Sequence, residues 1–179
     1  MAIKTASGSD LRNSLSSGLV LLNTTSFSGV ASVSLPANTF STTYDSYLVI
    51  LKCGISTASY MNGRLRSSGA DDTTSNYQSG WTGIILNGGG ASSDTAGAAS
   101  NIWSRIGYAS GSGEIWIAYT FHNPKLTGRT MVTYQQTRID AVANSGGAIF
   151  NAATSFDSAS FLANSGTITG SVSAYGYNQ

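Results

Sequence analysis

Charged residues are scarce in this chain. Asp, Glu, Lys and Arg make up 9% of its 179 residues, whereas about 25% is typical of a soluble domain. The hydrophobic fraction is an ordinary 41%, so Ser, Thr, Asn, Gln and Gly must cover the surface. Such a surface suits a protein packed against neighbours, because each ion removed from water would cost free energy. The formal net charge of +1 gives no long-range field for nucleic acid or an anionic membrane, so we expect neither partner.

Cysteine and long apolar segments are scarce as well. Cys53 is the only cysteine, which excludes an intrachain disulfide. Its apolar setting in YLVILKC predicts a buried thiol that behaves as a small hydrophobic residue. The N-terminal segment lacks an apolar core of signal-peptide length, and no apolar run approaches the roughly 20 residues that cross a bilayer. We therefore expect synthesis in a cytoplasm without export by this route.

The residues that usually carry catalysis or metal binding are few. His122 is the only histidine, which removes most metal sites and His-based triads. Its place before Asn123-Pro124 predicts a half-exposed residue at a strand end. The adjacent Asp71 and Asp72 are a candidate for part of a cation site, with a solvated turn as the alternative. We predict no enzymatic activity, no cofactor and no metal.

Turn-forming residues recur about every 8 to 12 positions, which is typical of an all-β sandwich or barrel. We expect eight to ten strands, because some neighbouring runs merge. Two segments, 67–77 and 86–100, are predicted as long loops, the second one containing three consecutive glycines, and long loops tend to be functional or to contact a partner. The expected strands are 18–27, 30–35, 46–53, 59–67, 76–86, 101–108, 114–122, 128–136, 147–152, 158–163 and 167–177.

The first residues differ in character from the rest. Residues 1–17 are polar and rich in Ser, and we predict an N-terminal arm there, followed by a single β-sandwich domain over 18–179. Leu11, Leu15 and Leu19 recur at a spacing of four, which predicts one short helical turn and no longer helix.

The polar and apolar faces of individual strands point to contacts. Arg64 and Arg66 share one face of their strand, and the singly scattered arginines favour inter-strand or inter-subunit ion pairs over a nucleic-acid groove. The strand 114–122 is apolar on both faces, with Trp116 and Ala118 on one of them, so it is either central in a sandwich or covered by a second subunit.

The closing strand and the aromatic residues are candidates both for the core and for an interface with another chain. Residues 167–177 place small apolar residues on one face and hydroxyls with Tyr175 and Tyr177 on the other. The small face suits the interior, and the tyrosine face suits a neighbouring chain or solvent. The three tryptophans and nine tyrosines are read as core or interface residues, with a sugar-stacking platform as the alternative.

Four phrases carry a resemblance: GLVLLNTTSFSGVASVSL, FSTTYDSYLVIL, GRLRSSGADDTTSNYQ and GTITGSVSAYGYNQ. In this order, with the Asn123-Pro124 turn between them, they resemble a family of small virion proteins of tailed bacteriophages, especially marine and cyanobacterial ones. The similarity covers most of the chain and is least over 84–112. It implies a jelly-roll-like antiparallel β-sandwich with a short N-terminal arm, and it carries over no catalytic residues.

We therefore expect a non-enzymatic structural protein of the virion, assembled in the host cytoplasm, and above all a capsid decoration subunit. Its expected partners are the major capsid protein or other virion proteins and further copies of itself, with a trimer favoured. The alternative is a tail-fibre or receptor-binding module that recognises a host surface glycan through the Tyr and Trp residues and the two loops. The residues expected at an interface are Leu11, Leu15, Arg64, Arg66, Trp116, Tyr175 and Tyr177.

Overall fold

The protein consists of β-strands joined by short connections. A computed structural model describes residues 18–86, 89–109, 113–139 and 141–178, and within these ranges it contains thirteen strands and no helix. The strands are β1 (Gly18–Val30), β2 (Ser32–Ser34), β3 (Ser46–Ile55), β4 (Ser59–Ser67), β5 (Ala70–Asp71), β6 (Tyr77–Ile85), β7 (Ala91–Ser100), β8 (Trp103–Ala109), β9 (Glu114–His122), β10 (Gly128–Arg138), β11 (Val142–Thr154), β12 (Ser158–Ala163) and β13 (Ile168–Asn178).

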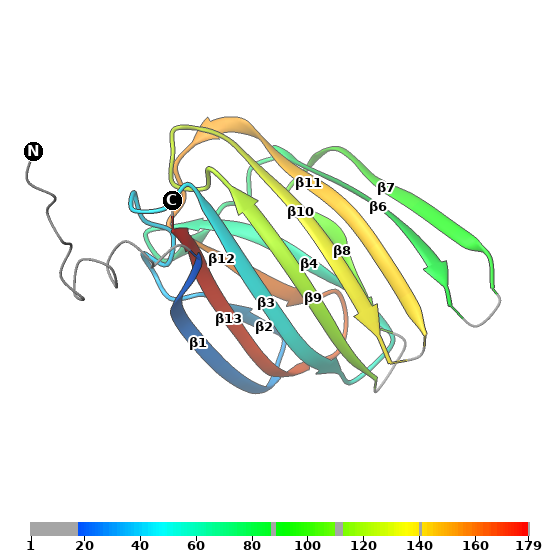
Figure 1. The fold of residues 1–179 in the computed structure, drawn as a ribbon. Coiled ribbons are helices and arrows are strands. Elements are labelled where there is room, and N and C mark those ends of the chain that lie inside the picture. The colour runs from blue at the N-terminus through cyan, green and yellow to red at the C-terminus, as the bar shows by residue number, and fades with distance from the viewer. Residues whose placement is uncertain (1–17, 87–88, 110–112, 140, 179) are drawn as a thin grey trace, which may run out of the picture.

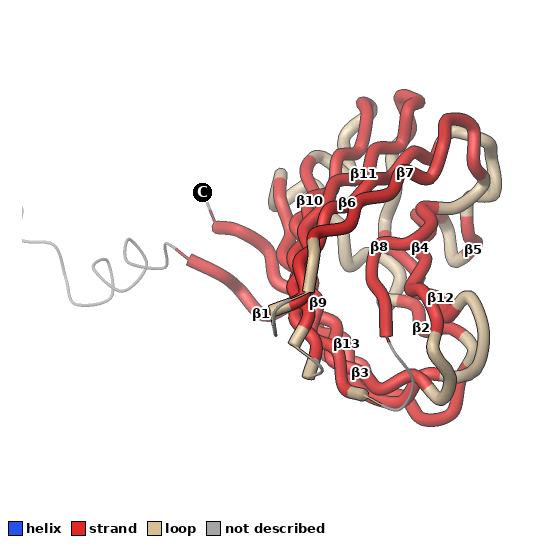
Figure 2. The backbone as a smooth tube through the Cα atoms, turned by 90° about the vertical axis from the view of Figure 1, so that its right-hand side faces the viewer, coloured by secondary structure: helices blue, strands red, loops and turns tan. Residues whose placement is uncertain are grey.

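These strands form two sheets packed face to face, and every pairing is antiparallel. The large sheet has the order β1-β13-β3-β9-β10-β11-β6-β7, and the small sheet has the order β2-β12-β4 with β8 and the short β5 on the far side of β4. Figure 1 looks onto the outer face of the large sheet, and Figure 2 shows the two layers edge-on. The chain is an antiparallel β-sandwich, as the sequence predicted.

Eight of the strands have the connectivity of a jelly roll. One layer begins β1-β13-β3-β9 and the other runs β2-β12-β4-β8, which is the pair of four-stranded sheets of two Greek keys. The other strands of the large sheet, β10, β11, β6 and β7, continue it sideways beyond this eight-stranded unit (Figure 1). The large sheet is therefore wider than the small sheet that covers it.

The core between the layers is built from aromatic rings. Tyr119 of β9 stacks on Phe161 of β12 with ring centroids 4.9 Å apart, and Tyr77 of β6 meets Trp103 of β8 edge-on at 5.2 Å. All four rings are essentially inaccessible to solvent. Aromatic pairs of this kind add about 0.5–1.5 kcal/mol each beyond their buried area, so they hold the two sheets together.

Polar side chains of the large sheet stabilise β8, which has a strand neighbour only along β4. Gln136 accepts from the backbone N–H of Tyr108 at 2.9 Å and donates to its carbonyl. The Tyr119 hydroxyl donates to the Ile106 carbonyl at 3.0 Å. Buried backbone groups without hydrogen-bond partners would cost free energy. The side chains of Gln136 and Tyr119 supply partners to the backbone of β8, and in doing so satisfy their own polar groups inside the sandwich.

The closing strand behaves as its alternation predicts. Ile168, Val172 and Ala174 are completely buried, and β13 lies between β1 and β3. Gly176 packs under the ring of Tyr44, where a Cβ atom would lie 2.5 Å from the nearest ring carbon. A register shift in β1 lies next to Gly170. The strand therefore uses one glycine for a close approach and has the other beside irregular pairing.

Two expectations are wrong, and others lie outside the described residues. The segment 86–100 is mainly strand β7 rather than a loop, because its small residues pair with the backbone of β6 although they have low strand propensity. The strand count exceeds eight to ten, since β7 and the two-residue β5 in the segment 67–77 were not expected. The arm over 1–17, with Leu11 and Leu15, lies outside the described residues, whereas Leu19 lies in strand β1.

Candidate functional site

The only histidine lies beside a serine but lacks the setting of a catalytic pair. Pairing of β3 with β9 places Ser46 opposite His122, and the Ser46 Oγ is 3.3 Å from Nδ1 of the ring. Both residues stand on the outer face of regular, paired strands, where the backbone N–H groups serve the ladder rather than an oxyanion hole. His122 is half-buried at the end of β9, which agrees with the strand-end position predicted for it.

Asp71 is held by arginines. Its carboxylate lies 3.0 Å from Arg66 Nε and 3.9 Å from Arg64 Nη1, and it accepts a hydrogen bond from Ser160 Oγ at 2.7 Å. The expectation of an inter-strand ion pair is confirmed for both arginines, which the alternation of β4 places on one face. A cation would have to compete with two guanidinium groups for Asp71.

The neighbouring acid has a local structural role. Asp72 Oδ1 accepts from the backbone N–H of Thr74 at 2.9 Å and from its hydroxyl at 2.5 Å, which is the hydrogen bonding of an Asx turn. In the described residues, no group of three or more His, Cys, Asp or Glu side chains is arranged to hold a metal ion.

Of the three tryptophans, one is at the surface. Trp103 is in the core and donates through Nε1 to the Ile149 carbonyl at 2.9 Å, while Trp81 is partly buried against the core. Trp116 is 53% exposed on the outer face of β9, with Lys52 Nζ 4.9 Å from its ring centroid. It stands on a central strand of the large sheet, at a position that nothing in the described residues covers.

The paired ends of β1 and β13 form an apolar projection. Register pairing places Leu19 opposite Tyr177 and Leu21 opposite Tyr175 on the outer face. Leu21 is 56% exposed, and Val20, which points to the other face, is still 38% exposed. Figure 2 shows these ends reaching past the body of the sandwich on the side away from the small sheet. Apolar residues are thus uncovered on both faces of this end of β1, at the edge of the large sheet.

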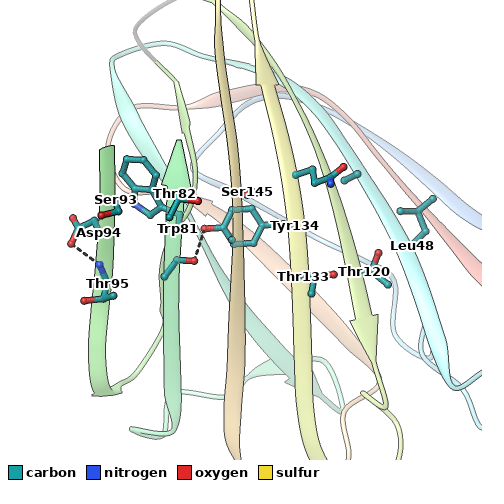
Figure 3. A pocket seen from close by; sticks show the side chains of 14 residues that line it. Leu48, Trp81, Thr82, Ser93, Asp94, Thr95, Thr120, Thr133, Tyr134 and Ser145 are labelled. Carbon is teal, nitrogen blue, oxygen red and sulfur yellow. Dashed lines mark hydrogen bonds between the residues drawn. The ribbon is translucent and has the colours of Figure 1, made fainter. Parts of the chain in front are cut away.

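A groove lies on the outer face of the large sheet, over its lateral extension. Its main hollow has a volume of about 960 Å³ and spans six adjacent strands, from β3 to β7 (Figure 3). The residues on its outward side, all of which alternate with inward-facing ones, are Leu48, Gly80, Thr82, Ser93, Thr95, Ala118, Thr120, Thr133, Gln135 and Ser145.

The register explains why the sheet is hollow there. Gln135 lies between Ala118 of β9 and Ser145 of β11, and Ser145 lies opposite Thr82 of β6. Small side chains thus surround each larger one. Two further hollows of about 410 Å³ each continue along β10 past Thr137 toward Trp116 and complete what we call the outer groove.

Charge is nearly absent from the main hollow. Asp94 is its one carboxylate or cationic residue, and it is paired with Arg105 of β8. The other polar side-chain groups are hydroxyls, one amide, the indole N–H of Trp81 and the phenol of Tyr134, whose hydroxyl is directed to the Arg105 carbonyl at 3.2 Å. Sequence analysis missed this groove, although the alternation Thr133, Gln135, Thr137 was its visible signal.

The buried ionisable groups are inert. Burial raises the pKa of the Cys53 thiol to about 12, so the thiol stays neutral and unreactive, as predicted. Burial likewise raises the pKa values of Tyr77, Tyr119 and Tyr134. These shifts follow from apolar surroundings rather than from an activating partner and therefore do not indicate a nucleophile.

The fold and its surfaces define an all-β sandwich with an apolar projection and a groove whose main hollow is lined by a single charged residue, Asp94. The sequence matches no protein-family model and no curated protein. Among the described residues no helix has the length and hydropathy to span a membrane.

Proposed function

We propose that this protein is a non-enzymatic structural subunit of a bacteriophage virion, and specifically a capsid decoration subunit that binds coat protein and further copies of itself. The observation that carries the proposal is the apolar projection formed by Leu19, Val20 and Leu21 with Tyr175 and Tyr177. The printed pairing of β3 with β13 reaches only Gly176, so Leu19 and Tyr177 extend beyond it, and apolar surface on both faces of this end of β1 favours burial against another chain.

The composition supports an adhesive role. With 9% charged residues, the chain can place its hydroxyl-rich surface against a neighbour without desolvating many ions. Each Å² of apolar surface that the projection buries contributes about 25 cal/mol, less the entropy lost on association. Repeated over many copies, such contacts would stabilise a shell against internal pressure.

The expected assembly is a ring of identical subunits. A contact between unlike surfaces of two copies closes into a ring when the rotation permits, and a trimer is the proposed closed form. In this arrangement the projection of one subunit lies on the sandwich of the next or on the coat protein beneath. Arg64 and Arg66, which the sequence placed at an interface, are bound to Asp71 within the chain and are left out of the proposed contact.

The experiment is to count and locate the protein in purified virions. Quantitative mass spectrometry with immunogold labelling should find hundreds of copies spread over the head. A handful of copies at the tail tip would contradict the decoration role and favour the receptor-binding alternative.

A variant pair tests the projection itself. Replacing Leu21 by Ser should abolish or strongly weaken binding of the protein to particles stripped of it, because the serine removes apolar contact area. Leu126→Ser is the matched control, since Leu126 is an exposed leucine outside the projection. Equal binding by the two variants would show that the projection is not the contact surface.

A further inference from the structure

We propose that the outer groove is a binding site for a neutral, extended glycan. This inference does not rest on the proposed function, because binding belongs to the isolated chain and can be measured without virions. The main hollow of the groove has a volume of about 960 Å³, and ligand sites commonly have volumes of about 300–1,000 Å³.

The lining matches the chemistry of an uncharged sugar chain. Thr82, Thr120, Thr133 and Ser145 supply hydroxyls, and Gln135 supplies an amide. Each of these groups can both donate and accept a hydrogen bond, as sugar hydroxyls require. An anionic ligand would need cations, but the main hollow contains no Lys or Arg. A cationic ligand would meet only Asp94, whose carboxylate is paired with Arg105.

The shape matches a chain rather than a single small molecule. The main hollow crosses six strands, from Leu48 of β3 to Ser93 of β7. Five strand-to-strand spacings of about 4.8 Å give a length of roughly 24 Å. A groove of that length, without end walls on a sheet face, fits several consecutive sugar units of an extended chain.

The hollow is not a requirement of the fold. A Cβ atom added at Gly80 would lie 3.5 Å from the Asp94 carbonyl oxygen and 3.5 Å from Thr95 Cγ2, which is ordinary contact. At Gly147, which pairs with Gly80 and with Thr133, a Cβ atom would lie 3.7 Å from the Val132 carbonyl oxygen. Larger residues would fit both positions and add strand propensity, yet both positions are glycine and the space remains.

An aromatic surface stands at one end of the groove. Trp116 lines the terminal hollow together with Glu114, Thr137, Arg138 and Ile139, and the Lys52 ammonium lies 4.9 Å from its ring centroid. Contact with the ammonium restrains the indole while half of its surface stays exposed. A restrained, exposed indole offers an apolar face to the C–H groups of a sugar ring.

A second copy of the chain fits the groove less well. A twofold contact through this face would place hollow against hollow, and the resulting void would lose the contacts that stabilise a packed interface. The neutral glycan is therefore the occupant that the shape and the chemistry of the groove favour.

The test uses native affinity electrophoresis of the full chain in gels that contain one soluble polysaccharide each. The neutral probes are a β-glucan, an α-glucan, a galactomannan and a xylan, and alginate is the anionic probe. We expect retardation by at least one neutral probe and none by alginate. Calorimetry with a hexasaccharide prepared from the retarding polymer then gives Kd.

A matched pair of glycine variants locates the site. Gly80→Leu fills the groove and should raise Kd at least about tenfold, equivalent to about 1.4 kcal/mol. Gly54→Leu is the control, because Gly54 is on the same face of the sheet outside the groove and a Cβ there meets nothing within 4 Å. Gly54→Leu should bind like the wild type, and Trp116→Ala should weaken binding about fivefold.

Three results would overturn the proposal. The first is no retardation by any neutral probe and no heat with their hexasaccharides at about millimolar concentration. The second is a Gly80→Leu variant that is folded by circular dichroism and binds as tightly as the wild type. The third is self-association of the wild type, measured by sedimentation, that is lost in Gly80→Leu and kept in Gly54→Leu. That result would assign the groove to a second copy of the chain.

Discussion

Alkaline pH should destabilise the sandwich through its buried acids, and Cys53 gives the sharpest measurement. The thiol is 2% exposed, and burial raises its pKa from 9.0 to about 12. Because the folded-state pKa is the higher one, the stabilisation is fully present below pH 9 and is lost as pH rises from 9 toward 12. Between about pH 8 and about pH 10 the unfolded thiol loses its proton while the folded thiol keeps it, which lowers the free energy of unfolding by about 1.4 kcal/mol.

The assay compares wild type with Cys53→Ala by urea unfolding at several pH values. Removing the sulfur lowers stability at every pH by a roughly constant cavity term, so the readout is the pH dependence of the difference. Tyr77 and Tyr134 titrate in both proteins and cancel. The pKa of Tyr119 is raised mainly by burial and in part by Cys53, so the comparison ends at about pH 10, where the buried thiol still carries its proton. The stability advantage of the wild type should shrink by about 1.4 kcal/mol between about pH 8 and about pH 10.

Two outcomes would refute this reasoning. A difference that is independent of pH would mean that the thiol has the same pKa in the folded and unfolded chains. Rapid reaction of the native thiol with a disulfide reagent at about pH 8 would mean that the side chain is accessible, in contrast with its position inside β3.

Three further predictions concern stability, each measured by urea unfolding. Gly146→Ala should cost about 1–3 kcal/mol, because the new Cβ would lie 2.4 Å from the Gly80 carbonyl oxygen and from the Tyr134 ring, whereas Gly147→Ala should be neutral; equal effects would refute the contact. Tyr77→Phe should cost about 1–3 kcal/mol, since its hydroxyl accepts from the Leu65 N–H at 3.1 Å and donates to the Asp72 carbonyl at 2.9 Å; an unchanged midpoint would contradict this. Asp71→Asn should cost about 1–3 kcal/mol by leaving two half-buried guanidinium groups without their carboxylate, and a loss below about 0.3 kcal/mol would place the pair among weak surface bridges.

The strands that sequence predicted best are those with strong alternation or many β-branched and aromatic residues. The bounds of 59–67, 114–122 and 158–163 agree with β4, β9 and β12. In β9 the periodicity of two is reinforced by burial of one face, which fixes the register, whereas the first four residues of β12 are all buried. Local propensity and tertiary packing therefore gave the same answer.

Strand β7 was not predicted because its own residues have little preference for the strand conformation. ASSDTAGAAS has few side chains that favour a strand, and the segment is extended because β6 offers it an unpaired edge. That edge exists only after β6 has joined β11 on the widened sheet. Pairing between distant segments thus decides the conformation, and no local pattern records it.

The groove was missed for a related reason. The alternation of Thr133, Gln135 and Thr137 with buried residues indicates an exposed polar face, but a hollow also needs small residues on the neighbouring strands at the same level. The small residues beside this face are Ala118, Ser145 and Gly80. They come to the same level only through the register of three separate strand pairings, β10 with β9, β10 with β11 and β11 with β6. Sequence reasoning had no access to that register, so it placed the glycan alternative on the segments 67–77 and 86–100. The structure separates these segments, since β5 pairs with the small sheet and β7 lines the groove.

The two proposed surfaces constrain each other. The apolar projection rises on the outer side of the sandwich at the β1 edge, and the outer groove lies on the same side over β10 and its neighbours (Figures 1 and 2). A partner that encloses only the β1 and β13 ends leaves the groove accessible, whereas a partner that covers the whole outer face occludes it. Retention of glycan binding by assembled particles would therefore confine the contact to the β1 edge. Loss of binding on assembly, with the free chain still binding, would mean that the subunit presents its small sheet to solvent.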